Sequence, residues 1–469
     1  MNSITRDINP WLPEPGSLER PVYLSLVERI ISAVDSGELV ERSRLPTHRE
    51  LSAHLGISAQ TVSRAYEELA RRGMISSSVG RGTFVAKSGL DKPAYPHIPE
   101  RSKETIDLSI LKPASDSLHL EKLRSALINL AEDLPLTSAF SFRPNVALAQ
   151  NRSAGVRWLR SYGVEVEEHN LLVTNGATPG MTLALMSALT PGSTLLSEAI
   201  GHHTLKPLTA YLGANLKALK IDAEGLCPDA LEQACSDEGV KALFIMPGPI
   251  SPTVAVMQNE RRLRIAEIAR RKGIFIIEND PLGALVEGDL VPFVNLAPER
   301  TFYVTSFTKS IMPGLRIGYV VAPSSLLPAA TNRSLVTTWM ATPLMAEIAS
   351  RWIFDGTAKM FLDWQRKELN KRHQIASECL QGIRYSSHPQ GLHLWVPLEA
   401  GHTEDAFVSN VRLRNVGIAR GSAFMLSAQP CPPAVRISVG ATSPDDLRLG
   451  LEIVASVLKE VPEPVLPTL

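Results

Sequence analysis

A lysine and a nearby arginine carry the most specific chemical signal in the sequence. Lys309 and Arg316 occur in the segment TSFTKSIMPGLRIGY, together with Ser306. An amine at the end of a buried strand can form a Schiff base with an aldehyde, and an arginine one to two turns further on can hold a phosphate group. A lone lysine is usually a solvated surface charge, but these residues occur together. The segment therefore predicts a site for a phosphate-bearing aldehyde cofactor.

A second segment has the residue types that read DNA. Helical periodicity predicts a helix from Ser58, its cap, to Arg72. Polar residues lie on or near the exposed N-terminal part of this helix: Ser58, Gln60, Thr61 and Arg64. A helix fits the major groove, where glutamine can pair with adenine and arginine can reach guanine or phosphate. Solvated charges on a small helical domain are the alternative interpretation.

The elements around this helix form a recognisable set. Apolar residues at helical spacing predict a first helix over residues 21–34, and Thr47 with Glu50 has the capping-box spacing of a second helix, which ends at Gly56. Short strand-like runs at 74–78 and 83–85 flank the tight turn Gly80-Arg81-Gly82. We therefore expect a winged helix-turn-helix domain over residues 16–86, in which Arg49 and Arg81 contact phosphates.

The rest of the chain has a different pattern. Residues 87–105 are polar, contain several prolines and lack periodicity, so we expect a linker there. Beyond it, helical stretches alternate with short apolar runs that predict buried strands at 171–174, 194–196, 242–246, 274–277, 302–305 and 317–321. Alternation of this kind indicates a doubly wound α/β domain over residues 106–469.

Composition excludes several classes of protein. The 469 residues contain 48 Lys and Arg against 48 Asp and Glu, and 44% are hydrophobic, which excludes disorder and a wholly basic nucleic-acid coat. The 4 cysteines have no metal-ligand spacing, so no metal site and no disulfide framework is expected. The N-terminal residues lack an apolar signal region, and no apolar run is long enough to span a membrane. We expect a soluble, cytoplasmic protein.

The N-terminal segment resembles the GntR family of bacterial regulators. The resemblance is carried by PVYL, by LPTHRELSAHLGISAQTVSRAYEELARRGMI and by VGRGTFV. It implies that double-stranded DNA is a partner and that the DNA interface contains Arg49, Ser58, Thr61, Arg64, Arg81 and Gly82. Ala59 departs from the family, in which many members have arginine, and this bears on the strength or choice of a base contact.

The large domain resembles the fold-type I, aspartate-aminotransferase-like enzymes that use pyridoxal 5'-phosphate. This resemblance implies a Schiff base between the cofactor and Lys309, with Ser306 and Arg316 at the phosphate. In VTNGATPGMTLAL, the residues Gly176, Ala177 and Thr178 match the phosphate loop that opens a helix, where backbone amides favour an anion. Arg436 in VRISVG matches the arginine that clamps the carboxylate of the substrate.

The contacts to the cofactor ring depart from this family. The aspartate that faces the pyridine nitrogen falls on Asn279, and the tyrosine at the ring hydroxyl falls on Leu282. The adjacent Asp280 is not expected to substitute, because successive strand residues point to opposite faces. Three further family positions are also altered: the ring-facing asparagine is Ser251, the stacking aromatic is His202, and the tyrosine donated across the dimer is Phe142. An imidazole can stack, so His202 stays a candidate ring contact.

A GntR-type winged helix joined to an aminotransferase-like domain resembles the MocR (TauR or PdxR-like) regulators. The resemblance implies a homodimer that responds to pyridoxal phosphate and to an amino-acid-like effector. Transamination needs a protonated ring as an electron sink, and Asn279 cannot supply the carboxylate that maintains it, so we expect little or no turnover and assign no catalytic residue. Two alternatives stay open: an aminotransferase with a DNA-binding appendage, and a regulator whose pocket no longer binds the cofactor.

Overall fold

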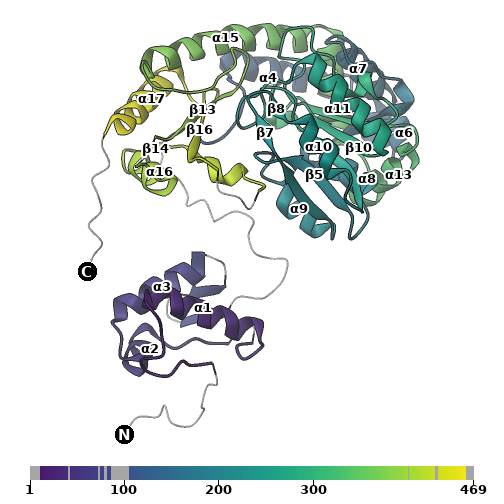
Figure 1. Ribbon diagram of the computed structural model, residues 1–469. Helices are drawn as coiled ribbons and strands as arrows, with labels where there is room; N and C mark the ends of the chain where they lie inside the picture. Colours follow the sequence, from purple (N-terminus) through teal and green to yellow (C-terminus); the bar gives the residue numbers. More distant parts are fainter. Residues whose placement is uncertain are drawn as a thin grey trace. The chain divides into compact units, whose positions relative to one another are not determined.

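The computed structural model describes residues 11–40, 43–71, 74–78, 82–85, 105–399, 401–427 and 431–460. The chain divides into two compact units, Met1–Arg101 and Ser102–Leu469 (Figure 1). The expected linker lies outside the described residues except for Thr105. Within the described ranges, no helix combines the length and the apolar character needed to cross a membrane.

The first unit is a helix-turn-helix followed by a two-stranded wing. Its elements are α1 (Val22–Asp35), α2 (His48–Leu55), α3 (Ala59–Arg71), β1 (Ile75–Ser78) and β2 (Gly82–Val85). Both reciprocal hydrogen bonds of the capping box between Thr47 and Glu50 are present, and Gly56 ends α2 in the left-handed conformation with φ 66°. The strands β1 and β2 pair antiparallel. The winged helix-turn-helix prediction is therefore confirmed.

The core of this unit is formed by the apolar faces of its helices. Val62, Ala65, Tyr66 and Leu69 of α3 are all buried, as the helical spacing requires. The Tyr66 hydroxyl donates a hydrogen bond to the Pro46 carbonyl (2.8 Å). Trp11 is also fully buried in this core, although it precedes the expected domain start at residue 16.

A seven-stranded sheet organises the second unit. Its strands lie in the order β4-β12-β11-β10-β9-β5-β6. All neighbours pair parallel except β12, which is antiparallel to both β11 and β4. The strands are β4 (Leu171–Thr174), β5 (Thr194–Glu198), β6 (Asn215–Leu219), β9 (Val240–Ile245), β10 (Phe275–Asn279), β11 (Thr301–Ser306) and β12 (Gly318–Val321). Each predicted buried strand is present, within a few residues of its expected bounds.

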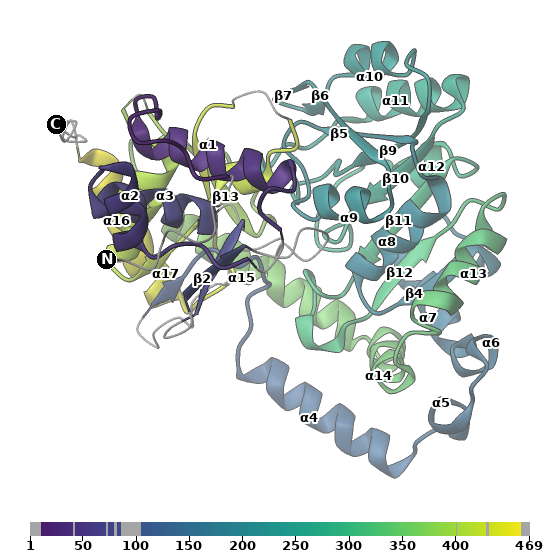
Figure 2. The same cartoon turned by 90° about the horizontal axis from the view of Figure 1, so that it is seen from below.

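Both faces of this sheet are covered by helices (Figure 2). Alternate strand residues such as Leu195 and Ile277 pack in the core that includes α8 (Ala177–Ala188), whereas Leu196 and Ile276 pack in the core that includes α11 (Asn259–Lys272). The helices α10 (Pro228–Ala234) and α12 (Phe293–Leu296) lie on the α11 side. Burial on both faces explains why the strands are continuous apolar runs.

A smaller layer follows in the sequence. The sheet β13-β16-β15 and the parallel pair β14-β3 lie beside three helices (Figure 1). These elements are β3 (Ile106–Asp107), β13 (His393–Pro397), β14 (Val416–Gly417), β15 (Ala419–Arg420), β16 (Ala434–Ser438), α15 (Thr357–Cys379), α16 (Glu404–Leu413) and α17 (Pro444–Lys459). The strand β3 therefore joins the beginning of the second unit to its end.

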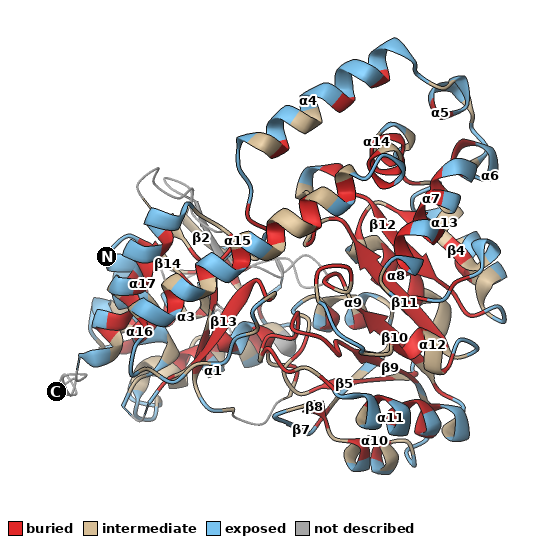
Figure 3. Ribbon diagram, turned by 90° about the horizontal axis from the view of Figure 1, so that it is seen from above, coloured by how far each residue is buried: buried red, intermediate tan, exposed pale blue. Residues whose placement is uncertain are grey.

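Several of the remaining helices have exposed residues (Figure 3), and some of these residues are apolar. They are α4 (Ser117–Glu132), α5 (Leu136–Phe140), α6 (Pro144–Ala147), α7 (Ala149–Arg160), α9 (Leu205–Tyr211), α13 (Leu327–Thr337) and α14 (Pro343–Phe354), with the short strands β7 (Ile221–Asp222) and β8 (Gly225–Leu226) and the 3-10 turns η1 (Glu168–Asn170), η2 (Pro313–Leu315) and η3 (Gly421–Phe424). Leu136 and Phe140 are 75% and 81% exposed, and Ile128 of α4 is 60% exposed. Large apolar side chains exposed to this degree are candidates for contact with a partner.

Candidate functional site

Lys309 lies three residues beyond the carboxyl end of β11, an inner strand of the large sheet. Its ammonium group donates a hydrogen bond to the Leu111 carbonyl. Burial, together with the positive charges of Arg436 and Arg316, lowers the pKa of Lys309 to about 8. A substantial fraction of the amine is therefore neutral near physiological pH, which is the state that attacks an aldehyde.

The residues predicted to hold a phosphate group lie together. Gly176 precedes α8 with φ 95°, and a Cβ added to it would lie 2.9 Å from Nη2 of Arg316, so only glycine fits. Arg316 also has a left-handed backbone (φ 53°), and it donates hydrogen bonds to Thr308 Oγ1 (3.3 Å) and to the Asn175 carbonyl (3.4 Å). Ala177 and Thr178 form the first turn of α8, whose backbone amides can bind an anion.

Arg436 on β16 contacts an aromatic ring and a backbone carbonyl. Its guanidinium lies over the Phe424 ring at 4.4 Å from the centroid, and Nη2 donates to the Ser109 carbonyl (2.9 Å). Its Nε is buried without a hydrogen-bond partner. Burial lowers the pKa of Arg436 to about 10, so the side chain keeps its charge at neutral pH.

His202 and Ser251 come from loops that follow β5 and β9. The His202 ring stacks on His203 with centroids 4.6 Å apart, and its Nδ1 is 2.7 Å from Thr204 Oγ1. Burial lowers the pKa of His202 to about 3, and His203, Lys309 and Arg436 add to this effect, so the ring is neutral. Ser251 is buried, and its hydroxyl lies 3.2 Å from Thr253 Oγ1.

Asn279 and Asp280 point to opposite faces of the sheet, as the sequence predicted. Asn279 lies two residues after Ile277 on β10, so the two side chains point to the same face of the sheet, the face that packs against α8. The Asp280 carboxylate instead accepts a hydrogen bond from the Tyr303 hydroxyl (3.1 Å). Burial raises the pKa of Asp280, and the positive charge of Arg262 on α11 partly opposes this rise. Asp280 therefore does not replace the missing carboxylate.

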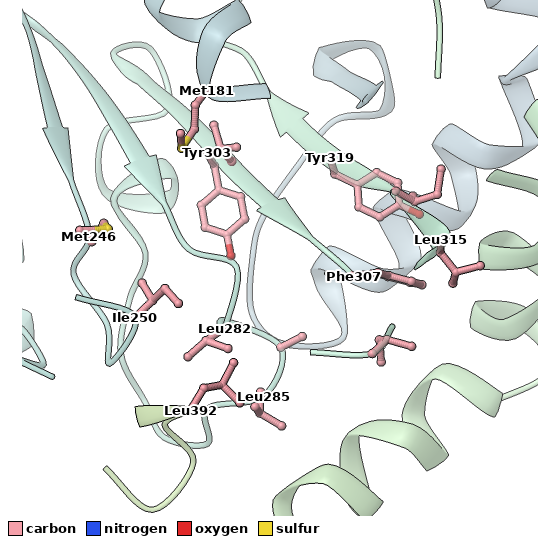
Figure 4. Packing of buried hydrophobic residues seen from close by; sticks show 14 of the residues in the cluster. Met181, Met246, Ile250, Leu282, Leu285, Tyr303, Phe307, Leu315, Tyr319 and Leu392 are labelled. Atoms are coloured by element: carbon pink, nitrogen blue, oxygen red, sulfur yellow. The ribbon is translucent and has the colours of Figure 1, made fainter. Parts of the chain in front are cut away.

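Leu282 contributes only packing. It is fully buried, and Figure 4 shows it beside Ile250, Leu285 and Leu392. A tyrosine hydroxyl is therefore absent from this position and a hydrocarbon surface takes its place.

The site has positive charge without an acidic counterpart. Among the residues that the structure describes, no carboxylate forms an ion pair with Lys309, Arg316 or Arg436. Ser306 Oγ and Asn279 Oδ1 are buried without partners, as is Arg436 Nε. Buried polar groups are rarely left unpaired, so these atoms indicate a place for a ligand. The donors fit a phosphate and a carboxylate, and they fit pyridoxal phosphate at its phosphate and aldehyde ends.

The contacts of Phe142 in the structure are with Trp339, and none with Lys309 is found among the described residues. The Phe142 side chain is 74% exposed, and its ring lies 5.0 Å from that of Trp339. The Trp339 indole also donates to the Phe142 carbonyl (3.0 Å).

The predicted DNA-contacting residues gather at the start of α3. Gln60 and Arg64 are exposed, and Thr61 is half-buried. Ser58 Oγ accepts a hydrogen bond from the Thr61 amide (3.1 Å), which makes it the helix cap. Arg49 is exposed on α2. The Arg64 guanidinium stacks over the Tyr23 ring at 4.0 Å from the centroid, so α1 fixes its direction.

The wing supplies a further group. Gly82 has φ 108°, and a Cβ added there would lie 2.9 Å from Arg44 Nε, which explains the glycine. Arg44 is exposed and pairs with Phe84 of the wing through an isolated bridge. Arg81 lies outside the described residues.

Sequence analysis missed several groups that contact the predicted site residues. Tyr23 and Arg44 could have been suspected only from their proximity to the DNA-binding segment. Ser109 and Leu111 contribute backbone carbonyls, which every residue has, so the residue types do not indicate these contacts. Phe424 is one aromatic residue among many, so its stacking on Arg436 had no sequence signal.

Two family models match the chain. Residues 103–454, more than half of the chain, match the family "Aminotransferase class I and II". Residues 22–85 match "Bacterial regulatory proteins, gntR family". The second match lies N-terminal to the first and does not overlap it.

Similar proteins and structures agree with these matches. The chain is 26% identical to the HTH-type transcriptional regulator YdeF of Bacillus subtilis, over 98% of this chain and 99% of the relative. It is 24% identical to the HTH-type transcriptional regulator YdcR of Escherichia coli, over 86% and 92% of the two chains. The fold is similar to that of kynurenine aminotransferase from Pyrococcus horikoshii (TM-score 0.69, 19% identity, 76% of this chain and 91% of that chain) and of the α-aminoadipate aminotransferase LysN from Thermus thermophilus (0.68, 20%, 76% and 92%). The chain therefore belongs to the class I and II aminotransferase family and carries a GntR-family helix-turn-helix domain ahead of the fold-type I domain, which is the MocR-like architecture.

Proposed function

We propose that this protein is a DNA-binding transcriptional regulator whose aminotransferase-like unit binds pyridoxal phosphate and an amino-acid-like effector, with little or no transaminase turnover. One observation carries the proposal. The cationic groups Lys309, Arg316 and Arg436 converge on a site without an ion-paired carboxylate among the described residues, while the position facing the ring nitrogen is the uncharged Asn279. The site is built to bind an anionic ligand but lacks the group that drives the reaction.

Each residue of the site has a role in binding. Lys309 would hold the cofactor through its amine, and Arg316, Ser306 and the first turn of α8 would bind its phosphate. When bound, the cofactor supplies an aldehyde that reacts with amines and a ring that can withdraw electrons. His202 would contact this ring, Ser251 and Asn279 would lie toward its edge, and Arg436 would bind the effector carboxylate.

The first unit reads DNA through α3. Gln60 and Arg64 contact base edges, Ser58 and Thr61 position the start of the helix, and Arg49, Arg81 and the backbone at Gly82 contact phosphates. The exposed apolar residues of α4 and α5 support a homodimer of the second unit, in which two winged helices address paired half-sites. A change in the dimer on effector binding would then change DNA binding.

A second candidate is an aminotransferase with a DNA-binding appendage. The retained lysine and phosphate residues favour it, and Asn279 with Leu282 opposes it. Purified protein with pyridoxal phosphate should be tested against a panel of α-, β- and ω-amino acids for two quantities: transfer of the amino group and affinity for a DNA duplex selected from a random library. The regulator predicts effector-dependent DNA affinity without turnover. Multiple turnover without any effect on DNA binding would support the enzyme.

Replacing Asn279 by aspartate should strengthen cofactor binding. A carboxylate facing a pyridinium nitrogen adds a charged hydrogen bond, worth about 1.5–3 kcal/mol, so the dissociation constant for pyridoxal phosphate should fall by about tenfold or more. An absorption titration measures this. Asp280→Asn is the matched control, because Asp280 faces Tyr303 on the other side of the sheet, and it should leave the titration unchanged. An identical curve for Asn279→Asp and wild type would show that the ring nitrogen does not lie at this position.

The rate of cofactor attachment should depend on pH through Lys309. Because the neutral amine is the reactive form and its pKa is lowered to about 8, the rate should rise with pH and level off above about 8. Stopped-flow absorption measures the rate. Arg436→Gln removes a positive charge but keeps a hydrogen-bond donor, so the pKa of Lys309 should rise and the inflection should move to higher pH. An inflection at the ordinary lysine pKa in the wild type would contradict the assigned environment.

A further inference from the structure

A short backbone segment accepts hydrogen bonds from two of the cationic side chains of the proposed site. Residues 108–112, which we call the strap, supply the Leu111 carbonyl to Lys309 and the Ser109 carbonyl to Arg436, the latter at 2.9 Å. Under the proposed function, Lys309 takes the cofactor aldehyde and Arg436 takes the effector carboxylate. The strap and the ligands therefore compete for the same two side chains.

Hydrogen bonds at the start of the strap fix its conformation. Asp107 Oδ1 accepts hydrogen bonds from both the amide (2.9 Å) and the hydroxyl (2.8 Å) of Ser109, which closes a tight turn. The Leu108 amide donates to the Gly417 carbonyl and the Ser438 amide donates to the Leu108 carbonyl, each at 2.7 Å. The strap is thus fastened to the small layer at Leu108, and residues 109–111 extend from that point to Lys309.

The strap lies close in sequence to the segment that connects the two units. Residues 86–104 connect the helices and wing of the first unit to Thr105, and the strap follows within the next few residues. Between residues 109–111 and the connecting segment lie Leu108, which is bonded to the small layer, and β3, which pairs with β14. A rearrangement of residues 109–111 therefore reaches the connecting segment through these two anchored elements. A ligand can shift a conformational equilibrium only if it interacts differently with the two states, and competition for Lys309 and Arg436 supplies that difference.

We propose that the strap is the regulatory element of this site: ligands that engage Lys309 and Arg436 displace the Ser109 and Leu111 carbonyls, and the released strap transmits occupancy to the connecting segment. This inference rests on the proposed function. It assigns to Asp107 the role of a positioning residue, which holds the strap in the arrangement that places its carbonyls on Lys309 and Arg436.

Substitution of Asp107 tests the competition, because competition and a purely structural role predict opposite changes in the affinity for pyridoxal phosphate. Asp107→Ala removes the acceptor that closes the Ser109 turn and should favour the released strap. The affinity for pyridoxal phosphate in an absorption titration of the full-length protein should then increase by about threefold to tenfold, because more molecules are binding-competent. Asp107→Asn keeps the Oδ1 acceptor and should behave as wild type. A purely structural role for Asp107 would instead weaken cofactor binding in Asp107→Ala.

Hydrogen exchange and DNA binding test the transmission. Adding pyridoxal phosphate to the wild type should accelerate amide exchange in peptides covering residues 105–113, and Lys309→Ala should show fast exchange that the cofactor does not change. Ligand-free Asp107→Ala should have the operator affinity of cofactor-bound wild type. If the visible band forms while strap exchange is unchanged and Asp107→Ala binds the cofactor no more tightly, the strap inference is wrong and the proposed function stands. If no band forms in the wild type, the proposed cofactor function fails, and the strap inference fails with it.

Discussion

Lys309→Ala should abolish the visible absorption band that pyridoxal phosphate produces with the wild-type protein. The band requires a covalent bond to an amine, and Lys309 is the amine that lies near Arg316 and Arg436 with a lowered pKa. Weak noncovalent binding should remain, because charged hydrogen bonds at the phosphate are worth about 1.5–3 kcal/mol each. Spectra recorded during titration with the cofactor measure both effects.

Exposed lysines also react with aldehydes, so this experiment needs a matched control. Lys359 of α15 is 75% exposed and pairs with Asp363, and Lys359→Ala should leave the band intact. Circular dichroism of both variants checks the fold. A band of wild-type amplitude in Lys309→Ala would remove Lys309 from the cofactor site. The absence of a band in every form would favour the alternative of a regulator whose pocket no longer binds the cofactor.

Arg64→Ala should weaken operator binding by about 5- to 150-fold, because a bidentate arginine contact to a base contributes about 1–3 kcal/mol. Its stacking on Tyr23 orients the guanidinium before DNA arrives, which lowers the entropy lost on binding. Gel-shift titrations with a duplex selected by the wild-type protein provide the measurement, and mutated base pairs show whether discrimination at one position is lost.

Arg49→Ala distinguishes a phosphate contact from a base contact. Loss of one phosphate contact should reduce the slope of log affinity against log salt by about one unit, with little effect on sequence preference. Arg29→Ala serves as the control, because Arg29 already pairs with Glu38 at 2.8 Å. Unchanged affinity for both Arg64→Ala and Arg49→Ala would contradict the assignment of α3 as the reading helix.

Local sequence patterns predicted most of the fold because the responsible interactions are local. The capping box of Thr47 and Glu50 involves residues three apart, and the buried face of α3 follows from helical spacing alone. The opposite directions of Asn279 and Asp280 likewise follow from the two-residue period of a strand. These features needed no knowledge of distant contacts.

Contacts between distant segments were not predictable in the same way. The stacking of Arg64 on Tyr23 and of Arg436 on Phe424 depends on how separate elements pack, and side chains of these types occur at many positions in the sequence. The family resemblance assigned Gly176 and Arg316 to one phosphate site, but the close approach of their atoms depends on how the start of α8 packs beside the residue that follows η2.

The sequence by itself determined that a winged helix-turn-helix precedes an α/β domain, and it identified Lys309, Arg316 and Arg436 together with the altered position Asn279. Periodicity, capping and the grouping of residues around Lys309 suffice for the domains and for the lysine, since they are properties of neighbouring residues. The roles of Arg316, Arg436 and Asn279 follow from the resemblance to the aminotransferase family. Only the tertiary structure decided that the cations converge without an ion-paired carboxylate among the described residues, and that the carbonyls of Ser109 and Leu111 engage Arg436 and Lys309. Backbone carbonyls are the same in every residue, so their role depends on where the folded chain carries them.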